Sequence, residues 1–551
     1  MTGRVLGLIA ATLVLGVSLT LGACQHEGHR PPCPPGALCL SDGNGAEPTS
    51  LDPAHFDGVW EANIVSQLIV GLTDIDADGK PKPAVATSWE TSPDGLTWTF
   101  HLRHDVKWSD GTLVTSADFV YGIQRVLDPK TASYSAFILF PFLRNAEAVN
   151  AGKLPLSAAG IEAPDPYTVV FRLSHPWPLL PAYAAGRAMW LEPRAAIQRW
   201  GDKWTKPGHY LSDGPYTLAD WRLGDAVVLR KNPLYFDAGK VCFNEVDFTP
   251  STDAVSNERS VKAGDLDVST TVQSNRVTLL RRTVLKDYLR TAPQFGVTYL
   301  SFNVKDPALK DVRVRQALSM AIDREFITGK LLRAGQRPAY SLVPPGLPDY
   351  RNGPKAYWAD WPLAQRQAEA RQLLAVAGYG PGHPLKIMVK HRNSADPLLF
   401  LPSVQNDWKA IGVQAELQQN DVQVAYMEYE LHDFQVGDAG WLAADGLAYL
   451  DIMRSDTGAN NFGQYANPAY DAELDAASDS PDPQVRAAHM RKAETLLLAD
   501  MPFAPVYYVA SRNLVSPRIT GWINNPIDTH GSQWLCQLPG RGAAAVGASA
   551  S

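Results

Sequence analysis

The fold class follows from one stretch of this chain, LKIMVKHRNSADPLLFLPSVQNDWKAIGVQAELQQ at residues 385–419. Its first part, 385–390, and its last part, 413–419, each predict a strand. The segment between them, near 397–410, predicts a helix. A strand–helix–strand order is typical of a parallel α/β layer, so we expect an α/β protein.

The same alternation of strands and helices extends outward from this stretch. Strands are predicted at 96–103, where LTWTFHLR alternates with period two, and at 168–174. Helices are predicted at 115–127, after a Thr or Ser cap, and at 311–332, after an acidic cap. A further helix is predicted at 363–380, where a Gly stands in the expected C-terminal position.

Size and charge narrow the classes of function. The chain has 551 residues, 45% hydrophobic and 19% charged, which is ordinary globular composition and enough for two to four domains. The formal net charge is −7. Because nucleic-acid binding needs a basic surface, we expect no nucleic-acid partner.

The amino terminus has the features of an export signal. Arg4 precedes an apolar run at 5–21, and the run ends in Leu-Gly-Ala-Cys at 21–24. This ending resembles the lipobox of bacterial lipoproteins. We therefore expect residues 1–23 to be a lipoprotein signal peptide. Cys24 would be lipidated and would anchor the protein in the periplasm or on the outer face of the cell envelope. A plain signal peptide and an uncleaved anchor helix remain as alternatives.

Four other cysteines follow, at positions 33, 39, 242 and 536. Outside the cytoplasm an even number favours disulfides. Three pairings are open. In one of them Cys33 and Cys39 close a small loop, and Cys242 then bonds Cys536.

Motifs for metal, cofactor and catalysis are incomplete. DIDADG at 74–79 copies the first half of an EF-hand loop, but the twelfth position is Val85 instead of Glu. A β-turn is the better interpretation. The chain has no Walker A pattern, no dinucleotide fingerprint, no G-x-S-x-G and no H-E-x-x-H. We expect no metal, no cofactor and no catalytic residues.

Six ordered blocks of sequence occur together in one known family. They are EPTSLDPAHFDGVWEANIVSQLIVGL (47–72), the region 87–133, GPYTLADW with LRKNPLYFD (214–237), DVRVRQALSMAIDR (311–324), NPAYDAELDAA (467–477) and PFAPVYYVASRNLV (502–515). Over about residues 46–536 the chain resembles the oligopeptide-binding proteins of bacterial ABC importers, the family-5 extracellular solute-binding proteins.

The resemblance implies a periplasmic-binding-protein-like α/β fold, with two lobes joined by a hinge and an extra N-terminal domain. Lobe I would comprise 42–70, 191–297 and 509–537, the extra domain 71–190, and lobe II 298–508. Residues 24–46 would be a flexible tether and 538–551 a disordered tail.

The resemblance also implies a function. The protein would be a monomeric, non-enzymatic receptor that encloses an extended peptide between its lobes and delivers it to an ABC permease and its ATPase. Three alternatives remain. The first is a binding protein for a sugar, an opine-like conjugate or a metal chelate. The second is a peptidase or cell-wall enzyme, and the third is a chaperone-like or signalling receptor.

The resemblance assigns peptide-binding residues to both lobes. Asp57, Gly58 and Val59 match one strand that pairs with the peptide, and Gly440, Trp441 and Leu442 match the other. Ligand-facing polar positions correspond to Thr270 and Thr271. Tyr299, Tyr507 and Tyr508 fall on or near the crossover strands, where core packing is the alternative.

Two carboxylates near Trp441 depart from the family pattern. The family places an Asp soon after this Trp to bind the peptide α-amine; here Asp445 comes one position late, and a surface turn before Gly446 is the alternative. Three residues before the Trp the family can carry an Arg, but this chain has Asp438. Asp438 would either favour a cationic group on the ligand or pair with a neighbouring Arg or Lys.

Overall fold

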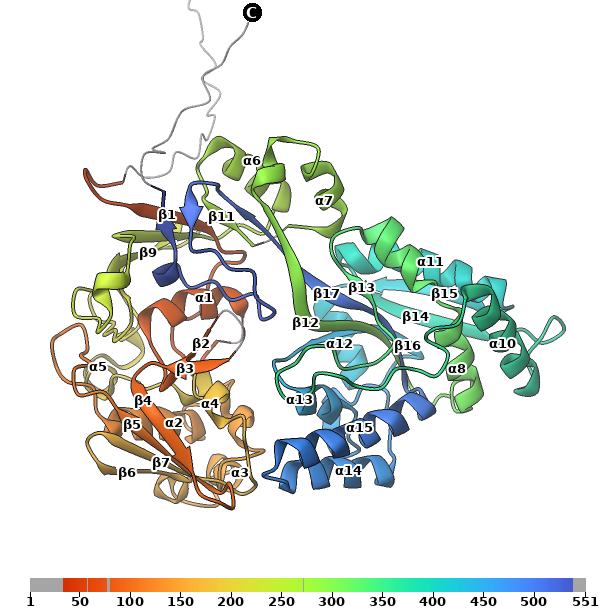
Figure 1. Ribbon diagram of the computed structural model, residues 1–551, viewed down its shortest axis with the longest axis horizontal. Coiled ribbons are helices and arrows are strands. Elements are labelled where there is room, and N and C mark those ends of the chain that lie inside the picture. Colours follow the sequence, from red (N-terminus) through yellow and green to blue (C-terminus); the bar gives the residue numbers. More distant parts are fainter. Residues whose placement is uncertain (1–32, 57, 77–79, 271, 539–551) are drawn as a thin grey trace, which may run out of the picture.

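The computed structural model describes residues 33–56, 58–76, 80–270 and 272–538. A large mixed sheet in the order β15-β14-β16-β12-β17-β11-β1-β10-β9-β8 extends through two lobes (Figure 1). The two long strands β12 (Leu289–Phe302) and β17 (Phe503–Val515) pair antiparallel and pass from one lobe to the other. They therefore form the connection about which the lobes can move.

Lobe I is built on the part of the sheet at one end of this connection. Its elements are β1 (Cys39–Gly43), α1 (Val59–Leu68), α5 (Arg194–Trp200), β8 (Tyr216–Arg222), β9 (Ala226–Lys231), β10 (Glu245–Thr249), α6 (Ala254–Ala263), β11 (Val268–Ser269), α7 (Ser274–Leu280), β18 (Ile519–Thr520) and β19 (Cys536–Gln537).

The extra domain packs on lobe I and has its own four-stranded sheet, in the order β4-β5-β7-β6. Its elements are β2 (Thr73–Ile75), β3 (Pro81–Pro83), β4 (Ala86–Thr91), β5 (Thr97–Leu102), α2 (Ser116–Leu127), α3 (Ala146–Asn150), β6 (Ile161–Asp165), β7 (Thr168–Arg172) and α4 (Leu180–Tyr183).

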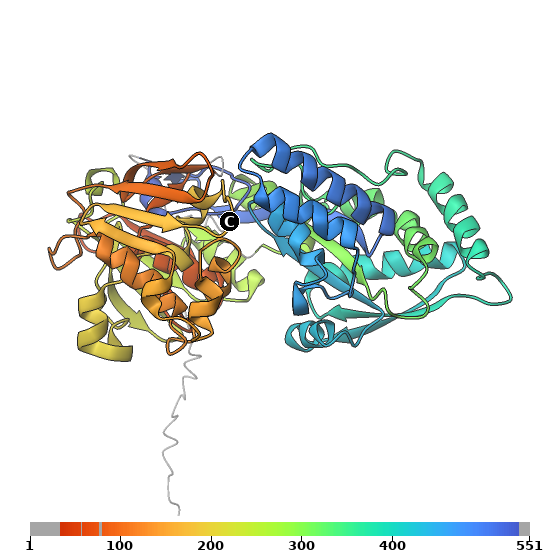
Figure 2. The same cartoon turned by 90° about the horizontal axis from the view of Figure 1, so that it is seen from below.

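Lobe II contains the parallel layer predicted from 385–419. Its elements are α8 (Val312–Ala321), α9 (Arg324–Phe326), β13 (Arg337–Pro338), α10 (Leu363–Val376), β14 (Lys386–Arg392), α11 (Ala395–Ala410), β15 (Gln414–Asn420), α12 (Val422–Glu430), β16 (Val436–Leu442), α13 (Gly446–Leu450), α14 (Pro468–Asp479) and α15 (Pro483–Asp500). Strands β14 and β15 pair in parallel along their whole length. Figure 2 shows the two bodies of the molecule from below, one coloured mainly red to yellow and the other mainly green to blue.

The single helix predicted at 311–332 is wrong. Helix α8 ends at Ala321, and the chain turns before a short α9 and a π-helical segment at 327–332. The cause is Arg324, whose completely buried guanidinium donates to the carbonyl oxygens of Ser319, Ala339 and Pro505. These bonds fix the backbone of three separate segments around one side chain.

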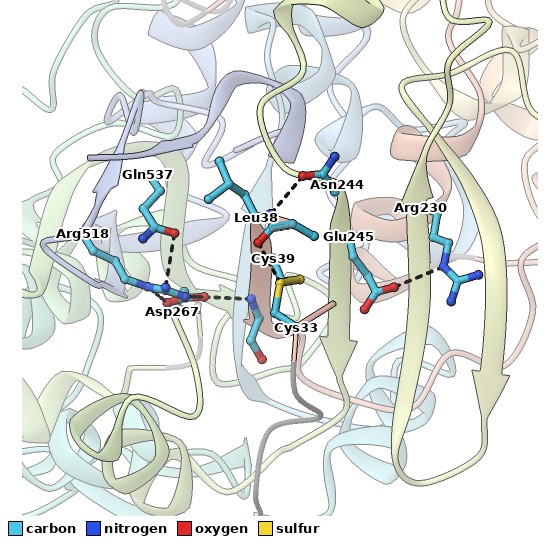
Figure 3. The surroundings of a disulfide bond; sticks show 11 residues. Cys33, Leu38, Cys39, Arg230, Asn244, Glu245, Asp267, Arg518 and Gln537 are labelled. Atoms are coloured by element: carbon cyan, nitrogen blue, oxygen red, sulfur yellow. Dashed lines mark hydrogen bonds and ion pairs between the residues drawn. A yellow bond between two sulfur atoms is a disulfide. The ribbon is translucent and has the colours of Figure 1, made fainter. Parts of the chain in front are cut away.

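Strand β1 lies within the segment 24–46 that the sequence assigned to a tether. It is parallel to both β10 and β11 in the middle of the lobe I sheet. The Leu38 N–H, just before this strand, donates to Asn244 Oδ1 at 2.9 Å (Figure 3). Within the strand, the Ser41 N–H donates to Asp267 Oδ2 at 3.0 Å. Any tether must therefore end before β1 begins at Cys39.

The four described cysteines form two disulfides. Cys33 bonds Cys39, and Cys242 bonds Cys536 across 294 positions of sequence. This is the pairing in which the neighbouring cysteines close a small loop.

Cys24, the lipidation candidate, lies outside the described residues. Within the described ranges, no helix has the length and apolar character needed to cross a bilayer.

Candidate ligand-binding site

Strand β16 presents an open edge. It is antiparallel to β12 along its whole length, from the Gly296–Leu442 pair to the Phe302–Val436 pair. Its other neighbour, β14, pairs with it only at Val436 and Gly437. In the described part of the chain, the stretch 438–442 therefore has a strand on one side only. Its second side can accept the backbone of an extended ligand.

The side chains at this edge differ in exposure. Leu442 is 58% exposed, whereas Gly440 and Trp441 are half-buried. The indole Nε1 of Trp441 is buried and has no hydrogen-bond acceptor within the described ranges. The three residues assigned to peptide pairing thus lie together on the part of β16 that β14 does not cover.

Asp438 does not face the ligand side. Its side chain is 0% exposed and forms an ion pair with Arg392 of β14, with Arg392 Nη2 and Nε at 2.7 and 2.9 Å from Asp438 Oδ2. The backbone N–H of Arg392 and the hydroxyl of Tyr429 donate to Asp438 Oδ1, at 2.7 and 3.3 Å. Of the two interpretations of the Asp438 side chain, pairing with a neighbouring arginine is the one that the structure shows. Contact of Asp438 with a peptide stays a prediction.

Asp445 is also buried, at 4% exposure, so a surface turn before Gly446 is not what it forms. Its Oδ1 caps helix α13 by accepting the Ala448 N–H at 2.8 Å. Its Oδ2 accepts the hydroxyl of Tyr183, which belongs to the extra domain, at 3.1 Å. Burial raises the pKa of Asp445. Asp445 therefore lies where the extra domain meets lobe II.

Two further carboxylates surround Asp445. Asp349 accepts the Gly446 N–H, with both oxygens at 3.1 Å, and Asp451 follows α13. Burial, followed by the charge of Asp445, raises the pKa of Asp349 to about 7. Burial also raises the pKa of Asp451 to about 7. Burial is the main cause of all three raised pKa values, and it favours the neutral form of each carboxyl.

Arg486 is the cation next to this group. It is 2% exposed, and its guanidinium lies over the ring of Trp177 in the extra domain, 5.3 Å from the ring centroid. Its Nη1 donates to the carbonyl oxygen of Ala477 at 3.2 Å. Nε and Nη2 have no acceptor in the described part of the chain. The charge of Arg486 favours ionised Asp445 without a direct hydrogen bond between the two side chains.

A cavity of about 450 Å³ opens beside Asp445, between all three parts of the molecule. Most of its lining is apolar. It is lined by Ile75, Lys80, Pro81, Ile138, Pro178, Leu179, Ala182, Tyr183, Gly186, Arg187 and Ala188 of the extra domain, by Pro348, Ala443, Ala444, Asp445 and Ala448 of lobe II, and by Ile527. Its volume lies within the range of roughly 300–1,000 Å³ that is usual for ligand pockets.

On the lobe I side, Gly58 precedes α1 with extended backbone angles, and Val59 is 68% exposed. Val59 and Thr270 line a second, smaller cavity of about 130 Å³, so the structure brings these two candidates together. Asp57 and Thr271 lie outside the described residues.

The three tyrosines on the crossover strands are core residues. Tyr299 is completely buried and packs edge-on against Phe503. The hydroxyl of Tyr507 donates to Asp396 Oδ2 at 3.3 Å, and that of Tyr508 lies 2.8 Å from Ser341 Oγ. Burial and packing suffice to explain Tyr299, and burial with internal hydrogen bonds suffices for Tyr507 and Tyr508. Their contact with a ligand stays a prediction.

Sequence reasoning missed four residues of this region: Tyr183, Asp349, Arg392 and Arg486. Arg392 lies two residues after the strand predicted at 385–390 and ends β14. The parallel register of Val389 with Val436 and Lys390 with Gly437 sets it beside Asp438, and this register was not predicted. Tyr183 had no signal in its local sequence, since its contact with Asp445 spans 262 positions of sequence.

No cluster of three or more His, Cys, Asp or Glu suited to a metal ion occurs among the described residues.

Known proteins share this architecture. A model of the bacterial extracellular solute-binding proteins, family 5 (middle region), matches residues 80–461. Periplasmic oligopeptide-binding protein OppA of Escherichia coli (strain K12) is 34% identical over 493 residues, covering 88% of this chain and 90% of that protein. The E. coli murein tripeptide-binding protein MppA has a TM-score of 0.79 at 32% identity, covering 91% of this chain and 99% of that one.

A second solved structure is that of Haemophilus influenzae OppA in complex with the peptide RPPGFSPFR. It has a TM-score of 0.77 at 30% identity and covers 91% of this chain and 99% of that chain. The likeness thus extends over nearly the whole of both chains, well beyond the region of the family model. This protein belongs to the family-5 bacterial extracellular solute-binding proteins.

Proposed function

We propose that this protein is the substrate-binding component of an ABC importer, and that it captures extended oligopeptides between its lobes. The observation that carries the proposal is the open edge of β16 at 438–442, next to a cavity lined by a buried carboxylate. A strand edge pairs with any peptide backbone and demands little of the side chains. This suits a receptor for peptides of varied sequence.

In this proposal Asp445 binds the α-amine of the peptide. An α-amino group is cationic near neutral pH, since its pKa is about 7.7–8.0. Enclosed away from water it needs a carboxylate partner, because an unpaired buried charge is costly. Asp445 lines the cavity, and its hydrogen-bond donors Ala448 N–H and Tyr183 hydroxyl are neutral. Its negative charge is therefore left for a cationic ligand group.

Transport follows from movement of the lobes. The crossover strands β12 and β17 act as the hinge, and a bound peptide shifts the equilibrium toward the closed form. The closed form docks on the permease and its ATPase. A lipid on Cys24 holds the monomeric, non-enzymatic receptor at the membrane on the outer side. The proposal includes no nucleic-acid partner, metal or cofactor.

The test is native mass spectrometry of the protein purified from its own envelope, followed by calorimetric titration with peptides. Co-purified peptides, and intact peptides recovered after incubation, are expected. Detection of a single co-purified non-peptide solute of fixed mass would show that the ligand is not a peptide. The protein would still be a solute-binding protein. Cleavage products that depend on active protein would overturn the receptor and indicate a peptidase.

A further inference from the structure

The cavity beside Asp445 has a composition that selects among ligands. Five of its lining residues are alanines, Ala182 and Ala188 on the extra domain and Ala443, Ala444 and Ala448 on lobe II. Their methyl groups leave space that larger side chains would fill. Proline, leucine and isoleucine form most of the remaining wall. Such a wall offers apolar contact and few hydrogen-bond partners.

The polar groups of the lining are placed unevenly. Arg187 is already engaged, because its Nε donates to Ser135 Oγ at 2.8 Å and its guanidinium lies over the ring of Phe56. Lys80 is exposed, as a residue at the rim would be. Asp445 is the acidic residue of the lining. The cavity therefore combines one buried negative end with an apolar body.

We propose that this cavity holds the side chain of the peptide's first residue, and that the receptor selects oligopeptides with a free α-amine and a bulky apolar first side chain. The inference rests on the proposed function, because it places the α-amine on Asp445. The first side chain leaves the peptide at the carbon that carries this amine. An amine held by Asp445 therefore puts that side chain in the space that Asp445 lines.

The size of the preference follows from the buried area. Transfer of a Leu or Phe side chain from water into an apolar site changes affinity by about 10- to 100-fold relative to Gly. A charged or amide first side chain would lose its hydration without gaining partners from this wall. Peptides that begin with Phe or Leu should therefore bind tightest, and those that begin with Asp or Gln weakest.

The experiment is calorimetric titration of the full-length protein with Phe-Ala-Ala-Ala, Leu-Ala-Ala-Ala, Gly-Ala-Ala-Ala and Ala-Ala-Ala-Phe. At least tenfold tighter binding of the first two over the third is expected. The fourth controls for position, and its affinity should lie close to that of the Gly peptide. Equal affinity for all four would overturn the cavity assignment but leave peptide capture intact. If none of the four binds, both proposals fail.

Two variants, one on each side of the cavity, test whether the first side chain of the peptide binds there. Ala444→Phe and Ala182→Phe should each reduce the ratio of affinities between the Phe and Gly peptides from at least tenfold to about unity. Ala375→Phe is the matched control, because Ala375 is exposed on α10 and lies outside the cavity lining. Circular dichroism checks folding. Ala444 is exposed, so its variant keeps the test available if Ala182→Phe unfolds. An unchanged ratio in the folded variants would overturn the assignment.

Discussion

At the scale of single residues, Asp438 and Asp445 differ in what compensates their charge. Asp438 is bonded directly to the Arg392 guanidinium inside the protein. Asp445 accepts hydrogen bonds from neutral donors, and its pKa is raised by burial. The first carboxylate is therefore part of the fold, and the second is available to a cationic ligand.

Asp445→Asn separates the charge of this residue from its capping role. Asn caps helices about as well as Asp, so α13 should form and stability should change little. A hydrogen bond to a charged group contributes about 1.5–3 kcal/mol, so affinity for a free-amine peptide should fall by about 10- to 100-fold. Calorimetric titration measures it.

The controls for this substitution are a peptide and a second variant. An N-acetylated peptide should bind the normal protein and Asp445→Asn equally weakly. Asp482→Asn changes the exposed cap of α15, which accepts the Gln484 N–H at 2.7 Å, and should leave affinity unaltered. Equal binding of acetylated and free-amine peptides to the normal protein would remove Asp445 as the anchor.

Asp438→Ala should destabilise the protein and should do so without any ligand present. Removal of one partner of a buried ion pair costs about 3–5 kcal/mol, because the other charge stays buried. The double variant Arg392→Met with Asp438→Leu should recover most of the loss, since it replaces both charges with apolar groups. Urea unfolding measures both. A loss below about 1 kcal/mol for Asp438→Ala would show that Arg392 finds another partner.

At the scale of elements, local pattern predicted the parallel layer of lobe II because its signals are short-range. Residues 385–419 form β14, α11 and β15 in that order. The predictions failed where a distant contact controls the backbone. Arg324 interrupts the helix predicted at 311–332 by bonding carbonyl oxygens as far away as Pro505. Likewise, the polar composition of 24–46 concealed β1, which is stable only between β10 and β11.

The open edge of β16 predicts which backbone N–H groups of a bound peptide form hydrogen bonds with the protein. Along a strand, successive N–H groups point to opposite sides, so N-methylation should remove hydrogen bonds to β16 at alternate positions of the ligand. Each lost hydrogen bond should cost about 0.5–1.5 kcal/mol, or about 2- to 10-fold in affinity. A scan of a tetra-alanine peptide by calorimetry measures this. No loss of affinity at either alternate set of positions would contradict pairing with β16.

At the scale of the whole molecule, the contacts that join the extra domain to lobe II among the described residues include three between side chains far apart in sequence. Tyr183 donates to Asp445, Trp177 stacks under Arg486, and His175 lies 2.9 Å from Asp479. Each joins residues more than 250 positions apart in sequence. Family resemblance predicted the strand edge and the anchor carboxylate, but contacts of this range depend on how the domains pack. Sequence patterns therefore could not predict these contacts, although two of them lie next to the proposed binding site of the peptide α-amine.

The three carboxylates beside Arg486, those of Asp349, Asp445 and Asp451, make the free energy of unfolding and the peptide affinity depend on pH. As pH rises, the first should fall and the second should rise. Burial raises the pKa of Asp349 and of Asp451 to about 7, and raises that of Asp445. The folded protein therefore binds more protons than the unfolded chain between about pH 4 and pH 7. Stability without ligand should accordingly fall as pH rises through this window.

A peptide α-amine favours the ionised carboxylates, so its binding should release protons below about pH 7, and affinity should rise from pH 5 to pH 7.5. The cations near these carboxylates include Arg486 and Arg454. Calorimetry at pH 6 in two buffers of different ionisation enthalpy gives the number of protons released. Asp445→Asn should reduce that number. Identical enthalpies in the two buffers would mean that the amine binds away from these carboxylates, because any cation placed beside them must displace their protons.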